Sequence, residues 1–175
     1  FPTSSATTAL WSCLKILNLK EGDEVLVSDF SYPATANVIE DVGAKPIFVD
    51  VSLKDFNMNP KELEKKISPK SKAVIFVDAL GNPSGISEIR KICNKRKLVL
   101  IEDAACAIGS SENGEKCGSI SDLTCFSFHP RKVICAGEGG AITTNNKEFA
   151  DKLKIKLSHG AKTDKNGNLK FVDFG

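Results

Sequence analysis

A lysine and an aspartate have the chemistry of one reaction centre, although 29 positions separate them (103 to 132). Lys132 lies five residues after the hydroxyl of Ser127 and shortly before a glycine-rich stretch, Gly137-Glu138-Gly139-Gly140. Asp103 closes an apolar run that begins at Leu98. An amine that can condense with an aldehyde and a carboxylate that can keep a pyridine nitrogen protonated are two groups that a pyridoxal phosphate site requires. The pair therefore predicts a site for that cofactor.

The same cofactor would need groups for its phosphate and for its ring face. The hydroxyl-rich segment Ser4-Ser5-Ala6-Thr7-Thr8 opens an expected helix, and the free amides of a helix N-terminus bind anions. Tyr32 is the only tyrosine, follows an expected strand and has a ring that can stack on another. Taken singly, these features also fit a surface lysine, a turn-capping acid, an N-cap serine and a core or loop aromatic. Their order along the chain favours one shared site.

The composition is typical of one globular domain. Of 175 residues, 41% are hydrophobic and 26% are charged, and a net charge of +2 is too small to indicate a nucleic-acid or membrane partner. No apolar run approaches the roughly 18 residues of a membrane helix, and no signal peptide is evident. Six cysteines without a CxxC pair, and only two histidines, fit neither a zinc cluster nor a disulfide framework. We therefore expect a cytoplasmic protein without a metal site.

Short apolar segments alternate with segments of helical period, which predicts an α/β fold with a mostly parallel sheet between helices on both faces. The expected strands span residues 24–28, 46–50, 73–77, 98–103, 124–128 and 140–144. The expected helices span residues 5–19, 34–42, 61–67, 86–96 and 147–157. Residues 81–85 are expected to form a loop, and residues 162–170 an exposed loop or hairpin. Asp103 and Tyr32 then fall at the carboxyl ends of strands, where open α/β sheets bind ligands.

With these residues identified, the chain resembles the DegT/DnrJ/StrS family of nucleotide-sugar aminotransferases, within the fold type I pyridoxal phosphate enzymes. The matching stretches are Ser4 to Leu10, Gly22 to Val25, Tyr32 to Asn37, Gly43 to Asp50, Ile101 to Ala105, Phe126 to Lys132 and Gly137 to Gly140. They run nearly from end to end. The most specific combination is the Glu-Asp-Ala-Ala element followed by the element from Ser127 to Lys132. The resemblance implies a three-layer α/β/α domain, the large domain of that fold type.

The resemblance also implies a role for each candidate residue. Lys132 would carry the covalently bound cofactor, and Asp103 would pair with the pyridinium nitrogen. Thr7 with its neighbouring amides, together with Ser127, would bind the phosphate, while Tyr32 would stack on the ring.

Some positions depart from the usual family pattern. The family usually has glycine where Ala6 stands, and a methyl group there could narrow the approach of the backbone to the phosphate. It usually has glutamine or histidine where Cys106 stands, near the ring hydroxyl of the cofactor, so a hydrogen bond there would be weaker or absent. Cys135 and Ala136 replace residues that commonly carry hydroxyls. None of these changes removes a group that the chemistry requires.

The implied activity moves an amino group from an amino acid, with glutamate as the expected donor, to a ketone on a nucleotide-linked sugar. Lysine at position 132 favours this transamination over the sugar dehydration of relatives that have histidine there. Two alternatives stay open. One is another fold type I reaction, such as a decarboxylation or a lyase step, and the other is a non-catalytic fragment that holds the cofactor weakly or not at all.

Members of the family are longer than this chain. We therefore expect residues 1–175 to be an incomplete cofactor-binding large domain, lacking an N-terminal segment and a C-terminal small domain. The expected full-length enzyme is a homodimer. Phe174-Gly175 resembles the start of a motif that reaches the phosphate site of the partner subunit.

Overall fold

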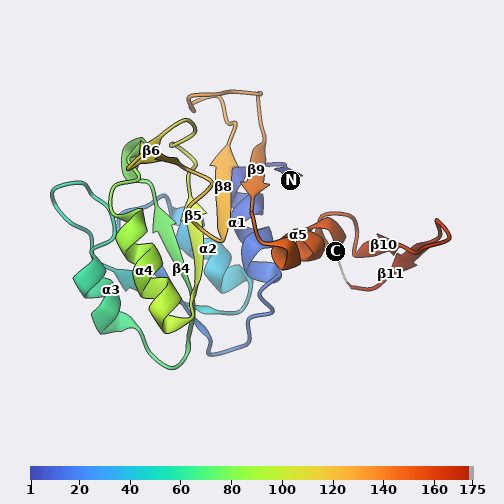
Figure 1. Ribbon diagram of the computed structural model, residues 1–175, viewed down its shortest axis with the longest axis horizontal. Helices are drawn as coiled ribbons and strands as arrows, with labels where there is room; N and C mark the ends of the chain where they lie inside the picture. Colours follow the sequence, from blue (N-terminus) through green and yellow to red (C-terminus); the bar gives the residue numbers. More distant parts are fainter. Residues whose placement is uncertain (174–175) are drawn as a thin grey trace.

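A seven-stranded sheet lies at the centre of the computed structural model, which describes residues 1–173 (Figure 1). Its strands are Pro2–Thr3 (β1), Glu24–Ser28 (β2), Lys45–Val49 (β3), Ser71–Val77 (β4), Val99–Asp103 (β5), Leu123–Ser127 (β8) and Gly140–Thr143 (β9). Their order across the sheet is β1-β9-β8-β5-β4-β2-β3. The five strands from β8 to β3 are parallel, whereas β9 runs antiparallel to β8 and β1 antiparallel to β9. The expected mostly parallel α/β fold is confirmed.

Helices cover both faces of this sheet. They are Ala6–Lys15 (α1), Pro33–Asp41 (α2), Pro60–Lys66 (α3), Ile86–Arg96 (α4) and Lys147–Lys156 (α5), with a short 3-10 helix at Ala79–Gly81 (η1). Helices α1, α2 and α5 pack against one face of the sheet and share one hydrophobic core, and α3 and α4 pack against the other face and share a second core (Figure 1). This arrangement is the expected three-layer architecture.

Strand residues alternate between the two cores. In β2, Val25 and Val27 join the core beneath α1 and α2, whereas Leu26 joins the core beneath α3 and α4. In β4, Ile75 joins the core beneath α1 and α2, and Phe76 joins the core beneath α3 and α4. Successive side chains of a strand point to opposite faces, so a strand covered on both sides is apolar throughout. Continuous apolar runs were therefore the correct signal for these strands.

The first helix is shorter than expected. It begins at Ala6 because the hydroxyl of Ser5 accepts a hydrogen bond from the amide of Thr8 at 3.1 Å, an N-cap arrangement. It ends at Lys15 instead of residue 19, and the following turn contains Asn18 with a positive φ of 52°. A left-handed residue cannot continue an α-helix, so the apolar periodicity beyond Lys15 does not extend it.

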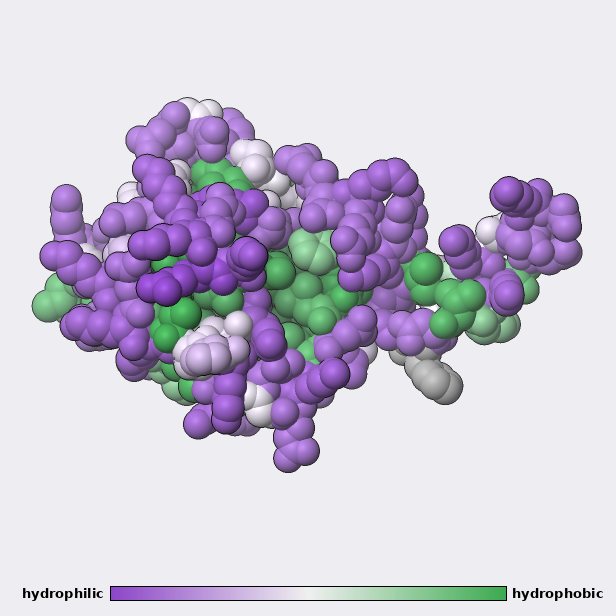
Figure 2. Space-filling model, turned by 60° about the horizontal axis from the view of Figure 1, so that its bottom comes forward, coloured by the Kyte–Doolittle hydropathy of each residue, from purple (hydrophilic) through white to green (hydrophobic). Residues whose placement is uncertain are grey.

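Two small hairpins lie outside the main sheet. One consists of Ser111–Glu112 (β6) and Glu115–Lys116 (β7), in the segment between β5 and β8. The other, Ala161–Thr163 (β10) with Leu169–Phe171 (β11), has its turn at the predicted place and projects from the body of the chain (Figure 1). Figure 2 shows hydrophobic surface on the projecting part at the right, where Leu169 and Phe171 are exposed. No helix within residues 1–173 is both long and apolar enough to cross a bilayer.

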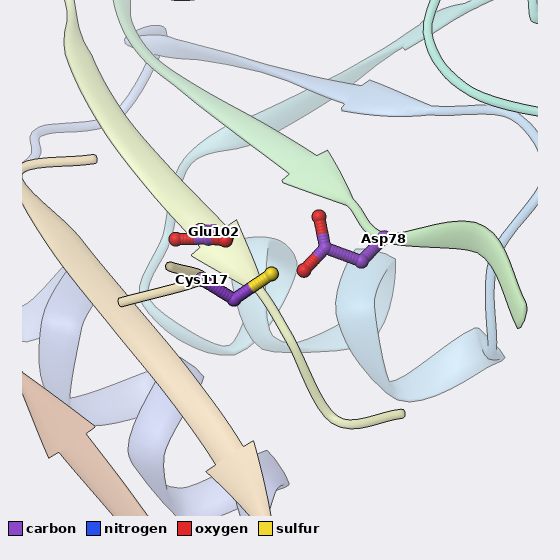
Figure 3. A group of neighbouring side chains, drawn as sticks. All are labelled: Asp78, Glu102 and Cys117. Atoms are coloured by element: carbon purple, nitrogen blue, oxygen red, sulfur yellow. The ribbon is translucent and has the colours of Figure 1, made fainter. Parts of the chain in front are cut away.

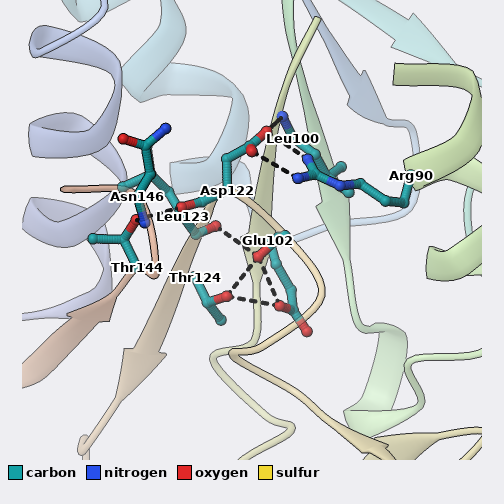
Figure 4. Close-up of polar contacts among 9 residues, drawn as sticks. Arg90, Leu100, Glu102, Asp122, Leu123, Thr124, Thr144 and Asn146 are labelled. Atoms are coloured by element: carbon teal, nitrogen blue, oxygen red, sulfur yellow. Dashed lines mark hydrogen bonds and ion pairs between the residues drawn. The ribbon is translucent and has the colours of Figure 1, made fainter. Parts of the chain in front are cut away.

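A polar network joins α4 to the sheet. Asp122 accepts two hydrogen bonds from the Arg90 guanidinium, at 2.6 and 2.8 Å, and a third from the amide of Leu100 at 2.8 Å (Figure 4). The carbonyl of Asp122 accepts a hydrogen bond from Thr144 at 2.7 Å. This residue therefore fixes the entry into β8 relative to α4 and β5, the strand that carries Asp103.

Candidate cofactor site

The carboxyl ends of the parallel strands meet at one edge of the sheet. Val77 of β4 pairs with Asp103 of β5, and Asp103 pairs with Cys125 of β8. β8 ends two residues later, at Ser127, where the loop to Lys132 begins. Parallel register therefore places the two sequence-distant residues, Asp103 and Lys132, at the same edge.

A cleft of about 490 Å³ opens at this edge, and we call it the main cleft. Its lining includes the residues that the resemblance placed beside the cofactor: Ala6, Thr7, Tyr32, Asp103, Cys106, Ser127 and Lys132. A second, adjoining cleft of about 280 Å³ shares Tyr32, Asp103, Cys106 and Lys132 and extends toward Phe30 and Leu80. Small-molecule sites are typically clefts of this size with a few convergent polar groups.

Asp103 is 7% exposed and is held from two sides. Its Oδ2 accepts a hydrogen bond from Thr35 Oγ1 at 2.8 Å, and its Oδ1 accepts one from the amide of Ala105 at 3.2 Å. Burial raises the pKa of the Asp103 carboxyl, while these two hydrogen bonds and the charge of Lys132 act to lower it. The net direction is a raised pKa, and the carboxyl group lies in a site that excludes most solvent, oriented by Thr35 of α2 and the amide of Ala105.

Lys132 is partly buried at the other side of the main cleft. Its Nζ donates a hydrogen bond to the Sγ of Cys106 at 3.1 Å. The cysteine follows β5 by only three residues, so the contact ties the loop after β8 to the loop after β5. It directs the amine into the space that Asp103 also lines.

The first turn of α1 forms another wall of the main cleft. The amides of Ala6 and Thr7 belong to the initial turn, whose N–H groups have no helical carbonyl to bond. Gly140, at the start of β9, approaches this turn so closely that a Cβ atom there would lie 2.6 Å from the carbonyl carbon and oxygen of Ser5. The glycine therefore permits the helix N-terminus to sit against the sheet edge and face the cleft.

The remaining two predicted residues differ in exposure. Tyr32 is 73% exposed, and the proline after it begins α2, so its ring stands at the mouth of both clefts. Ser127 is buried, and its Oγ accepts a hydrogen bond from the amide of His129 at 3.3 Å. Tyr32 is positioned as the N-cap residue of α2, and Ser127 as the last residue of β8.

Several lining residues received no role from the sequence. Thr35, the partner of Asp103, lies in the matched stretch after Tyr32, and its inward-facing position in the first turn of α2 was the available signal. His129, Arg131 and Glu138 also line the main cleft. Arg131 donates its amide to His129 Nδ1 at 3.2 Å, which shapes the turn before Lys132. Nothing in their spacing marked these three residues.

The donor set fits pyridoxal phosphate. A primary amine, a buried carboxylate, amides at a helix N-terminus and an exposed aromatic ring line the main cleft. These are respectively the groups that can bind an aldehyde, a protonated ring nitrogen, a phosphate and a ring face.

The comparisons with known proteins point in the same direction. The model of the DegT/DnrJ/EryC1/StrS aminotransferase family matches residues 2–174. GDP-perosamine synthase of Caulobacter vibrioides is 38% identical over 157 residues, which are 90% of this chain and 42% of that protein. PseC of Helicobacter pylori, an aminotransferase involved in the biosynthesis of pseudoaminic acid, superposes with a TM-score of 0.91 at 31% identity, covering 100% of this chain and 47% of that one.

A protein of Streptococcus pneumoniae, assigned as a sugar aminotransferase and solved in its PLP form, superposes with a TM-score of 0.88 at 30% identity, covering 98% of this chain and 49% of that one. The chain thus spans less than half the length of these relatives. The motif expected at Phe174-Gly175 lies outside the described residues.

Proposed function

Because the chain belongs to the DegT/DnrJ/EryC1/StrS aminotransferase family, whose members use pyridoxal phosphate, we propose that its full-length protein transfers an amino group from an amino acid to a nucleotide-linked ketosugar. The observation that carries this proposal is the convergence of Lys132 and Asp103 on one cleft, across 29 positions (103 to 132) of sequence. Residues 1–175 form, in this proposal, the large domain that holds the cofactor.

When bound, pyridoxal phosphate supplies an aldehyde that links to an amine and a ring that accepts an electron pair. Lys132 is the proposed covalent anchor. Once the amino acid displaces it, its Nζ is the proposed base that takes the proton from the α-carbon of the donor and later returns a proton to the product. Cys106, through its hydrogen bond to Nζ, keeps the amine directed into the cleft.

Asp103 is the proposed partner of the ring nitrogen. Its two carboxylate oxygens retain lone pairs beyond those that bind Thr35 and Ala105, and a protonated ring nitrogen would donate to one of them. The role requires an ionised Asp103, and the hydrogen bonds from Thr35 and Ala105 favour that form against the effect of burial. Thr35 is thus a positioning residue for Asp103.

The phosphate and the ring face have their own proposed contacts. The amides of Ala6 and Thr7, the Thr7 hydroxyl and Ser127 are proposed to bind the phosphate, with the positive end of the α1 dipole favouring the anion. Tyr32, at the cleft mouth, is proposed to cover one face of the ring. Cys106 takes the place near the ring hydroxyl and offers a weak donor there.

The substrate class comes from the relatives. One synthesises GDP-perosamine and another acts in pseudoaminic acid biosynthesis, so amino-sugar formation is common to both. We propose a nucleotide-linked ketosugar as acceptor and glutamate as donor. The adjoining cleft, which leads away from Lys132 toward Phe30 and Leu80, provides space beside the reacting groups.

A homodimer is proposed for the full-length protein. The β10–β11 hairpin projects from the body and exposes Leu169, Phe171 and Val172. Clustered apolar residues on a projecting hairpin favour burial against another surface. Sedimentation analysis of the full-length protein and of its Phe171→Ser variant measures this: a dimer that the substitution weakens supports the proposed role of the hairpin.

The central experiment uses the full-length protein loaded with pyridoxal phosphate. Borohydride reduction followed by peptide mass spectrometry should place the cofactor on Lys132, and incubation with glutamate should release 2-oxoglutarate in a stoichiometric half-reaction. Cofactor on another lysine would refute the assignment of Lys132. Cofactor on Lys132 without 2-oxoglutarate, but with loss of carbon dioxide or a side-chain fragment from an amino acid, would replace transamination by a decarboxylase or lyase reaction.

A further inference from the structure

Three buried side chains with metal-binding atoms meet behind the cofactor site. Asp78 follows β4, Glu102 lies in β5, and Cys117 lies in the loop after β7. They are 2%, 0% and 9% exposed. Their donor atoms all lie within 4.8 Å of one another, and Figure 3 shows the two carboxylates and the thiol turned toward a common point. We call these residues the buried triad.

One carboxylate oxygen of Glu102 accepts several hydrogen bonds, whereas the other accepts none from the residues around the triad. Its Oε2 accepts hydrogen bonds from Thr124 Oγ1 at 2.7 Å, Ser121 Oγ at 3.0 Å and the amide of Gly118 at 3.2 Å, part of which Figure 4 shows. These bonds lock the carboxylate in place. Its Oε1 and both carboxylate oxygens of Asp78 are buried and have no hydrogen-bond partner outside the buried triad within residues 1–173.

No basic side chain in the described part of the chain pairs with these two acids. The ion pairs found within residues 1–173 include neither Asp78 nor Glu102. Burial and the charge of Glu102 raise the pKa of Asp78 to about 9, so Asp78 carries a proton at neutral pH that a bound cation would displace. Buried unpaired carboxylate oxygens are rare because their desolvation is uncompensated. A positive ligand would balance them.

We propose that Asp78, Glu102 and Cys117 bind one divalent cation, Zn²⁺. Oxygen and sulfur donors lie about 2.0–2.3 Å from Zn²⁺, so an ion among three donors separated by at most 4.8 Å reaches all of them after small side-chain rotations. The thiolate excludes Mg²⁺ and Ca²⁺, which take oxygen ligands. The ion would bind with release of two protons, one from Asp78 and one from Cys117, leaving a two-carboxylate, one-thiolate site with a fourth position for water.

Such an ion would support the neighbouring site without entering its chemistry. Glu102 precedes Asp103 on β5, and the amide of Asp78 donates a hydrogen bond to the carbonyl of Asp103 at 3.1 Å. A cation that joins the end of β4 to β5 and to the loop of Cys117 would hold the backbone that carries Asp103. This inference is independent of the proposed aminotransferase activity.

The test measures metal content and stability of the full-length protein. The protein is dialysed against Zn²⁺ and then against metal-free buffer. We expect inductively coupled plasma mass spectrometry to find one zinc ion per chain. Chelation should lower its melting temperature. With Co²⁺ in place of Zn²⁺, we expect the visible bands of a tetrahedral site and a thiolate-to-cobalt band. Cys117→Ser should abolish that last band, and Asp78→Asn should lose the metal.

Two variants serve as matched controls. Cys93→Ser changes another buried thiol and Cys135→Ser an exposed one, and both should keep the metal and the thiolate band. Protein that retains no metal, with a melting temperature that neither Zn²⁺ nor chelator changes, would overturn the proposal and leave a proton shared between Asp78 and Glu102 as the counter-charge. Metal that survives Cys117→Ser and disappears with Cys135→Ser would also overturn it. The wild-type metal content alone decides the question if Asp78→Asn does not fold.

Discussion

The hydroxyl of Thr35 donates a hydrogen bond to Asp103 Oδ2 at 2.8 Å and thereby joins the first turn of α2 to the end of β5. Asp103 is almost fully buried, and burial alone would favour its neutral form. The hydrogen bond acts in the opposite direction, because it stabilises the carboxylate. It also means that the residue proposed to hold the cofactor ring is oriented by the element that carries Tyr32 at its N-cap.

Removing this hydrogen bond should make cofactor binding sensitive to pH. Thr35→Val raises the pKa of Asp103 further above its usual value, so a larger fraction of the carboxyl is neutral as the pH falls. A neutral Asp103 cannot hold the ring nitrogen protonated. We expect the Kd for pyridoxal phosphate to rise about tenfold, since a hydrogen bond to a charged group contributes about 1.5–3 kcal/mol, with a larger rise near pH 6 than near pH 8.

Absorbance titrations at the two pH values measure this effect. Thr35→Ser keeps the hydroxyl and is the matched control, for which we expect a Kd close to that of the wild type. An equal loss of affinity at both pH values would show that Thr35 acts through packing and not through the ionisation of Asp103.

Replacement of Lys132 should abolish turnover while leaving the fold intact. Lys132→Ala removes the proposed anchor and base, and a positioned general base typically contributes about 10²–10⁴-fold to a rate. We expect the transamination rate of the full-length enzyme to fall by at least that factor, with an unchanged melting temperature because Lys132 lines a cleft. Lys147→Ala, at a side chain 91% exposed, should have no effect on the rate.

The close approach of Gly140 to Ser5 should determine how well the first turn of α1 binds phosphate. Gly140→Ala places a Cβ atom 2.6 Å from the carbonyl of Ser5, and backbone atoms cannot rotate away. Forced overpacking of this kind costs about 1–3 kcal/mol. We expect a lower melting temperature and a weaker affinity for both pyridoxal phosphate and inorganic phosphate, measured by calorimetry.

A glycine outside the site provides the comparison for Gly140. Gly114, in the turn between β6 and β7, has a positive φ and open space around its Cβ position. Gly114→Ala should lower stability through backbone strain alone and leave phosphate affinity unchanged. If both alanine variants bind phosphate normally, the α1 N-terminus is not held by Gly140 in the manner proposed.

Substitutions of Arg90 and of Asp122 should lower the free energy of unfolding by different amounts. Asp122→Ala leaves the Leu100 amide without an acceptor and removes both bonds to Arg90, whereas Arg90→Ala leaves Asp122 bound to Leu100 (Figure 4). We expect Asp122→Ala to lower the free energy of unfolding by about 2–3 kcal/mol and Arg90→Ala by less. Urea denaturation measures both, and Asp151→Ala, at an exposed ion pair, should change stability very little. Equal losses of unfolding free energy for Asp122→Ala and Arg90→Ala would contradict the role given to the Leu100 amide.

Much of the fold and the composition of the candidate site could be predicted from local patterns. The apolar run ending at Asp103 predicted a strand with a ligand-facing end, because a strand covered on both faces is apolar throughout. The helix expected at residues 61–67 is α3, which begins one residue earlier at Pro60, because a proline there lacks only an amide that the first helical turn leaves unused. The types and order of Lys132, Asp103 and Tyr32 were enough to predict the cofactor.

Only the tertiary structure decided which distant groups touch. The hydrogen bond of Thr35 to Asp103, the direction of β9 and the close approach of Gly140 to Ser5 depend on strand register and helix packing, which local periodicity does not encode. The buried triad is the clearest case. Asp78, Glu102 and Cys117 come from three segments whose spacing in the sequence gives no sign of a contact, and they meet where the adjacent parallel strands β4 and β5 end at the same edge of the sheet.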